Sequence, residues 1–83
     1  MATATMRYWA AAKQAAGVAE ENVSAATLAD ALAVIARGRE ELRGVLARSS
    51  FVVNGDPVGG RAPESVPLAE GAVVEVLPPF AGG

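Results

Sequence analysis

The chain has 83 residues, 52% of them apolar, and seven basic against nine acidic residues give a net charge of −2. This length predicts one domain, and the lack of a clustered basic run argues against nucleic-acid binding. There is no cysteine and no histidine, which excludes disulfides, the usual zinc sites and catalysis by a cysteine or a histidine-activated serine. No segment reaches the roughly 20 apolar residues of a membrane span, and "MATATMRYW" is not typical of a signal peptide. We therefore expect a cytoplasmic protein without a metal site.

The first residues alternate with the period of a β-strand. In "TATMRYWA" one side is apolar and the other carries two threonines, an arginine and a tryptophan. The two sets are Ala4, Met6 and Tyr8, and Thr3, Thr5, Arg7 and Trp9. The next segment, "AAAKQAAG", is predicted to be a connection that Gly17 closes, and "EENVSA" a short edge strand.

A helix is predicted to begin at Thr27, because Thr27 and Asp30 resemble a capping box. Apolar residues then recur at helical spacing as far as Gly38; they are Leu28, Ala31, Leu32 and Ile35. "REELRGVLA" repeats the pattern briefly, although Gly44 costs about 1 kcal/mol relative to alanine. The arginines of this region are predicted to form a solvated helical face rather than a basic stripe for a partner; they are Arg37, Arg39, Arg43 and Arg48.

Two further strands are predicted in the second half of the chain. "SFVVNGDPV" is a strand that enters a tight hairpin at Asn54-Gly55, since both residues tolerate positive φ. After a loop and a turn at Glu70-Gly71, "AVVEVL" forms the last strand, which Pro78 and Pro79 end because proline cannot donate to a ladder. Its two faces carry Val74 and Val76, and Val73, Glu75 and Leu77.

These elements predict an α+β, ubiquitin-like fold in which one main helix packs across one face of a mixed sheet. The first and last strands lie side by side and parallel, and the helix packs Leu28, Leu32 and Ile35 on the sheet face of Met6 and Val74. Trp9 then points away from the helix beside Leu77, and such an exposed apolar patch favours a docking site over core packing of the tryptophan. Pro57 is a further candidate for partner docking.

The sequence finishes with "LPPFAGG". A frayed end is one interpretation; the other is that the two prolines hold a working tail away from the sheet. The α-carboxyl is an anion at neutral pH and a poor acyl donor, so it would have to be activated. Gly59-Gly60 is too short to be a phosphate-binding loop, and activation would therefore take place on a partner. Glycine suits such a tail because it has no Cβ to shield the terminal carbonyl.

The segments "RYWAAAKQAAG", "FVVNG" and "EGAVVEVLPPFAGG" resemble the ubiquitin-like sulfur carriers, which include the thiamin carrier and, as the best match, the small subunit of molybdopterin synthase. The resemblance covers nearly the whole chain and is most specific in "PPFAGG". It departs from the family where Lys13-Gln14 replaces a common Arg-Glu and where Ala72-Val73 replaces frequent acidic residues.

The resemblance implies a β-grasp fold, with residues 1–83 as one carrier domain and 78–83 as a flexible tail. It implies that Gly83 is adenylated and then thiocarboxylated, and that Gly82 is the second glycine of the pair. The tail that enters a pocket of the partner protein also includes Pro78, Pro79, Phe80 and Ala81. Such a chain is not catalytic alone and binds no cofactor. Its partners would be an adenylyltransferase related to ubiquitin-activating enzymes, which uses ATP, a sulfur donor protein, and the large subunit of the synthase, which holds the pterin precursor.

Three alternatives stay open at this point. The sulfur acceptor could belong to the thiamin, cysteine or siderophore type instead of the pterin type. The same glycine could form an isopeptide bond, as in a ubiquitin-like protein modifier. The chain could also be a plain binding module whose tail is inert.

Overall fold

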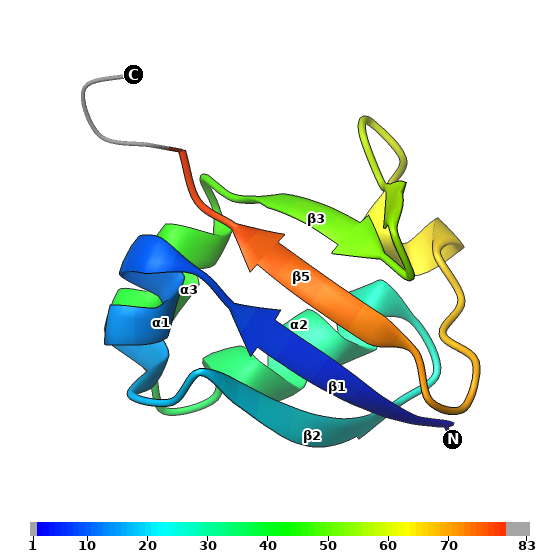
Figure 1. Cartoon of the computed structure of the whole chain (residues 1–83), viewed down its shortest axis with the longest axis horizontal. Coiled ribbons are helices and arrows are strands. Elements are labelled where there is room, and N and C mark those ends of the chain that lie inside the picture. Colours follow the sequence, from blue (N-terminus) through cyan, green and yellow to red (C-terminus); the bar gives the residue numbers. More distant parts are fainter. Residues whose placement is uncertain (1, 80–83) are drawn as a thin grey trace.

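The structure is a computed structural model that describes residues 2–79. Within these residues the chain forms a five-stranded sheet whose strand order is β2-β1-β5-β3-β4. The elements in chain order are β1 (Ala2–Tyr8), α1 (Ala10–Ala16), β2 (Glu20–Ala25), α2 (Leu28–Ala36), α3 (Glu40–Leu46), β3 (Ser50–Val53), β4 (Asp56–Pro57), the 3₁₀ turn η1 (Pro63–Ser65) and β5 (Val73–Leu77). Figure 1 shows the helices together on one face of the sheet.

The two central strands run parallel, and this confirms the predicted topology. β1 pairs with β5 in a register that places Met6 beside Val74 and Tyr8 beside Val76. The outer pairs β1–β2, β3–β5 and β3–β4 are antiparallel. Since parallel neighbours require a long crossover, the whole stretch from α1 to the loop before β5 serves as the connection.

The core lies between the sheet and the helices and follows the predicted alternation. The largest fully buried side chains are Tyr8, Met6, Leu28, Leu42, Val74 and Val76. Ile35 is buried as well, whereas Leu32 is only partly buried against this cluster. The predicted faces of the first and last strands are therefore confirmed.

Helix α2 begins as predicted. The Thr27 side-chain oxygen accepts a hydrogen bond from the Asp30 backbone N–H at 3.2 Å, which satisfies one of the N–H groups left over at a helix start. Gly38 follows the helix with φ of 71°. Helix α3 forms despite Gly44 because Leu42, Val45 and Leu46 are buried, and burial of such side chains outweighs a propensity cost of about 1 kcal/mol.

The prediction of a simple connection after the first strand was wrong. Residues Ala10–Ala16 form helix α1, which packs against α3, and Gly17 ends it with φ of 80°. Alanine is the strongest helix former, but a run of alanines shows no apolar stripe from which a helix could be recognised. The edge strand β2, by contrast, lies where the sequence predicted it.

The turn that joins β3 to β4 adopts the predicted geometry. Asn54 and Gly55 have φ of 52° and 82°, so the hairpin turn has positive φ at both central residues. The Asn54 side-chain oxygen also accepts a hydrogen bond from the Val73 N–H at 2.9 Å, which ties this turn to the start of β5. Among residues 2–79, no helix has the length and hydropathy that crossing a membrane would require.

Candidate functional site

The end of β5 is the last part of the predicted tail region that the structure describes. β5 ends at Leu77, at the corner of the sheet where β1 also ends and where α1 packs (Figure 1). Pro78 is buried and Pro79 is exposed. Proline fixes its own φ, so a buried proline fixes the direction in which the chain leaves the sheet. The other predicted tail residues, Phe80, Ala81, Gly82 and Gly83, lie outside the described residues.

The sheet face opposite the helices carries a row of side chains that the strand register brings together. Glu75 of β5 lies between Arg7 of β1 and Val52 of β3, and Val52 is paired in turn with Pro57 of β4. Val73 and Leu77 flank Glu75 along the same face of β5, and both are half-buried. We call the set Trp9, Val52, Pro57, Val73 and Leu77, with Glu75 among them, the open sheet face.

Trp9 joins this face through both its backbone and its side chain. Its backbone N–H donates to the Val76 carbonyl at 3.3 Å, which continues the parallel pairing of β1 and β5 by one residue. Its indole Nε1–H donates to Glu75 Oε1 at 3.1 Å. Trp9 remains 47% exposed, so it lies on the sheet surface and is not a core residue.

The predicted docking residues are thus placed unequally. Trp9 and Leu77 lie on the same face at the ends of neighbouring strands, next to the point where the tail begins. Pro57 is exposed on that face but at its far edge, two strands from β5. Sequence reasoning missed Val52, because the faces of "SFVV" could not be assigned without the pairing of β3 with β5.

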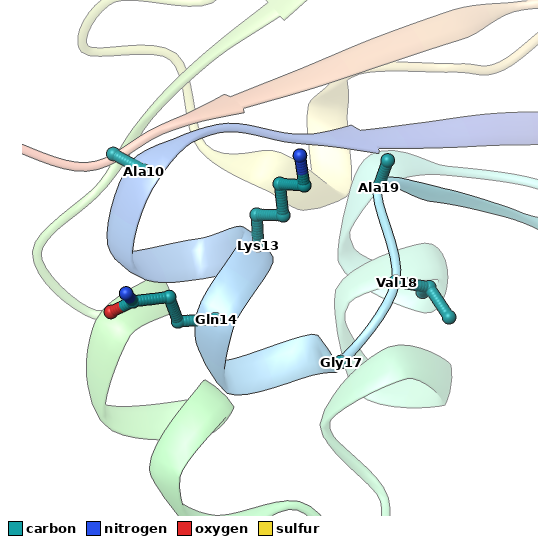
Figure 2. A pocket seen from close by; sticks show the side chains of 6 residues that line it. All are labelled: Ala10, Lys13, Gln14, Gly17, Val18 and Ala19. Atoms are coloured by element: carbon teal, nitrogen blue, oxygen red, sulfur yellow. The ribbon is translucent and has the colours of Figure 1, made fainter.

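A shallow pocket lies beside α1 and was not predicted. Ala10, Lys13 and Gln14 of the helix and Gly17, Val18 and Ala19 of the following segment line it. Figure 2 shows the Lys13 side chain on the side of Ala19, whereas Gln14 points away from it. Lys13 is exposed and is the only lysine in the sequence. Residues 2–79 hold no group of three or more acidic, histidine or cysteine side chains arranged to bind a metal ion.

The comparison with known families is decisive. A model of the ThiS family matches residues 6–83, which is nearly the entire chain and includes both final glycines. The chain belongs to the ThiS family. The family of ubiquitin-like sulfur carriers that the sequence predicted is therefore confirmed. None of the curated proteins gives a significant match.

Solved structures agree with the predicted β-grasp fold. Small archaeal modifier protein 1 from Methanosarcina acetivorans aligns with a TM-score of 0.86 at 21% identity, over 100% of this chain and 98% of that one. A Pyrococcus furiosus protein provisionally described as molybdopterin converting factor, subunit 1, aligns with a TM-score of 0.79 at 25% identity, over 96% and 100%. A chain of the complex of subunits 1 and 2 of the molybdopterin-converting factor from Helicobacter pylori aligns with a TM-score of 0.71 at 23% identity, over 98% of this chain and 99% of that one.

A cluster of three polar side chains, Tyr8, Glu21 and Arg39, lies on the helix side of the sheet. The Tyr8 hydroxyl and the Arg39 guanidinium both donate to Glu21 Oε2, and a second Arg39 nitrogen reaches Glu21 Oε1 at 3.2 Å. Arg39 is therefore held against the sheet and does not share the fully solvated face predicted for the four arginines. The cluster joins β1 and β2 to the junction of α2 and α3.

The cluster shifts the ionisation of its members in directions that its contacts explain. The hydrogen bond from Arg39 is the main reason that the pKa of Glu21 lies below its usual value, and the Tyr8 hydrogen bond adds to this. Burial, followed by the bond to the Glu21 carboxylate, raises the pKa of Tyr8. Glu21 is consequently ionised and Tyr8 protonated throughout the neutral range.

Glu21→Gln should lower the free energy of unfolding at pH 7 by about 2 kcal/mol, since it weakens charge-assisted bonds in a partly buried site. Because folding lowers the pKa of Glu21, this stabilisation is complete above the ordinary glutamate pKa of about 4.3 and disappears as pH falls through the folded-state pKa. Urea unfolding of both proteins over this range measures the difference. Glu20→Gln, which removes an exposed pair with Arg7, should cost less than about 1 kcal/mol. A Glu21 difference that stays constant in acid would contradict this account.

Proposed function

We propose that this chain is a sulfur carrier in which the carboxylate of Gly83 is adenylated by a partner, converted to a thiocarboxylate and used to donate sulfur. The observation that carries the proposal is the ThiS-family match, which extends through Gly82 and Gly83. The absence of cysteine supports it, because no side-chain thiol in the sequence could carry the sulfur instead.

The chemistry follows from the nature of a carboxylate. The carboxylate of Gly83 is an anion at neutral pH and gives up its oxygen only after it has been converted into a better leaving group. An adenylyltransferase in the cytoplasm would join the carboxylate to AMP from ATP and release pyrophosphate, and sulfide-level sulfur from a sulfur donor protein would then displace AMP to leave the thiocarboxylate. Neither Gly82 nor Gly83 has a Cβ, so the carbonyl is open to attack inside a narrow channel.

The described part of the chain would present the tail and hold the partner. From Pro78 to Gly83 six residues can span at most about 20 Å, enough to reach an active site that lies beneath a docked surface. Trp9 and Leu77 lie at the corner from which this tail departs. A partner that covers the open sheet face would therefore receive the end of the tail within about 20 Å of its docking contacts.

We further propose that the sulfur acceptor is a pterin precursor held by the large subunit of molybdopterin synthase. Support comes from the Helicobacter pylori structure, in which a protein of the same fold is in complex with subunit 2 of its factor. The test supplies thiocarboxylated protein to purified large subunit with the pterin precursor, and in parallel to a thiazole synthase with its own substrate. Molybdopterin should form only in the first reaction. Sulfur transfer in the thiazole synthase reaction and not in the pterin reaction would indicate that the chain serves the thiamin pathway.

The alternative of a protein modifier is favoured by one observation, the likeness over the full chain to a protein named as a small archaeal modifier. Lys13 allows a sharp prediction, because it is the only lysine and it is exposed. If the chain is a modifier, any self-conjugate through a side-chain amine must use Lys13. Lys13→Arg should then abolish dimeric and longer conjugates in cells, read by immunoblot and by mass spectrometry of the branched peptide, while Arg61→Lys should restore a conjugate at a new position.

In cells that contain the activating enzyme, a sulfur carrier should show monomeric thiocarboxylate and no such ladder. Conjugates of the chain with itself that persist in Lys13→Arg would place the linkage on the N-terminal amine, whereas conjugates with other proteins would use the lysines of those proteins and identify a modifier directly.

A further inference from the structure

Glu75 is a charged residue in an otherwise apolar part of the open sheet face. Val73 and Leu77 lie on either side of it along β5, and Val52 lies opposite it on β3. On the β1 side the direct neighbour is Arg7, and the indole of Trp9, two residues further along, donates a hydrogen bond to Glu75 Oε1 at 3.1 Å. Glu75 is half-buried as a residue, with apolar neighbours along β5 and on β3 and with Arg7 on its β1 side.

The positive charge nearest to Glu75 in the register is directed elsewhere. Arg7 is the β1 neighbour of Glu75, but its Nε donates to Glu20 Oε2 on the opposite side at 3.3 Å. Within residues 2–79, Glu75 makes no salt bridge, and Trp9 is the one side chain that donates a hydrogen bond to it. Its Oε2 therefore depends on solvent.

A partner that covers the open sheet face would remove that solvent. Burying an unpaired carboxylate is strongly unfavourable, and the usual compensation is an opposite charge with good hydrogen-bond geometry. Resting on the docking role proposed above, we propose that the protein that binds this face presents one arginine to Glu75. Arginine fits better than lysine because its planar group can bond Oε2 and stack on the neighbouring indole at once.

Glu75 also acts as a positioning residue for Trp9. The hydrogen bond holds the ring, and the backbone at Trp9 is held as well, because the Trp9 carbonyl accepts from the Ala12 N–H at 3.0 Å. A side chain that is ordered before binding loses less entropy when the partner arrives. Charge and positioning can be separated, since glutamine keeps an oxygen for the indole N–H but has no charge.

The experiment uses the full chain with 5-fluorotryptophan, which labels Trp9 alone because the sequence has one tryptophan. The purified adenylyltransferase and the purified large subunit are titrated against wild-type protein, Glu75→Gln, Glu75→Val and the control Glu64→Gln. Glu64 is exposed on η1, so its variant changes the net charge equally. The ¹⁹F resonance reports the environment of the indole, and the titration gives the dissociation constant.

Glu75→Gln should keep the ¹⁹F resonance of the unbound protein close to that of wild type. It should nevertheless raise the dissociation constant for at least one partner by about tenfold to a hundredfold, because it leaves the partner's arginine unpaired. Glu75→Val should shift the unbound resonance as well, and Glu64→Gln should bind within about twofold of wild type. The wild-type affinity should fall with added salt, and that of Glu75→Gln less so.

Equal affinity of wild type and Glu75→Gln for both partners would overturn the inference while leaving the proposed function intact. An equal loss with Arg7→Gln would show that Arg7 itself neutralises Glu75 in the complex, which also overturns it. A concentration-dependent dimer that Glu75→Gln abolishes, measured by sedimentation, would identify the occupant as a second copy and would overturn the inference of a partner protein. Wild-type protein that binds neither partner would overturn the proposed function together with this inference.

Discussion

A single alanine added after Gly83 is expected to abolish sulfur loading while the domain folds normally. The added residue moves the terminal carboxylate by about 3.5 Å, and a displacement of even 1 Å in a reacting group can cost about a hundredfold in rate. The core lies between the helices and the sheet and ends at Pro78, so stability should not change. The rate of loading is measured in a mixture of activating enzyme, ATP and sulfur donor, and the melting temperature is measured alongside.

Two further variants separate length from shape in the same assay. Deleting Gly83 shortens the tail and should also prevent loading, whereas Gly82→Val keeps the length and should hinder entry, because a β-branched side chain is bulky and restricts the backbone. Normal loading of the alanine-extended protein, without trimming of the added residue, would contradict the role of the terminal carboxylate. Full activity after removal of both glycines would indicate a binding module with an inert tail.

Trp9→Ala and Leu77→Ala are each expected to weaken the association with the activating enzyme or the large subunit by about 2 kcal/mol, roughly thirtyfold in dissociation constant. Both side chains lie beside the exit of the tail, and Trp9 is 47% exposed, so they can be covered by a partner. Their removal should affect folding less than binding, because neither belongs to the buried cluster beneath the sheet. Titration calorimetry with folded variants measures the loss.

Val34→Ala provides a matched control. Val34 is an apolar residue that is 37% exposed, but it lies on α2, which packs against the other face of the sheet (Figure 1). Its truncation should leave the affinity for both partners within about twofold of wild type, as expected for a residue outside an interface. Unchanged affinity for Trp9→Ala and Leu77→Ala as well would show that the open sheet face is not the docking surface.

The strands and their faces could be predicted because the sequence expresses them locally. Met6 and Tyr8 alternate with polar residues, Val74 and Val76 do the same around Glu75, and period two fixes the face of each. The start of α2 at Thr27 and the turn at Asn54-Gly55 were likewise predictable from single side chains with specific backbone preferences. The parallel pairing of the first and last strands followed once the two were placed side by side in mid-sheet, because the helical region then serves as the crossover.

The features that could not be predicted depend on contacts between distant parts of the chain. The hydrogen bond from Trp9 to Glu75 joins residues 66 positions apart and exists only in one register of β1 against β5. The Tyr8–Glu21–Arg39 cluster requires three elements to meet, and nothing in the local sequence marks Glu21 as its centre. Helix α1 was missed for a different reason, since an alanine run carries no apolar pattern to show which face is buried.

The central claim is that sulfur is carried on the carboxyl group of Gly83, and intact mass spectrometry tests it most directly. The full chain is incubated with the activating enzyme, ATP and the sulfur donor, and its mass is then measured before and after fragmentation. We predict the mass increase of one oxygen-for-sulfur exchange, confined to the C-terminal fragment that ends at Gly83. An unchanged mass in an otherwise active mixture, or sulfur found on any other residue, would contradict the account.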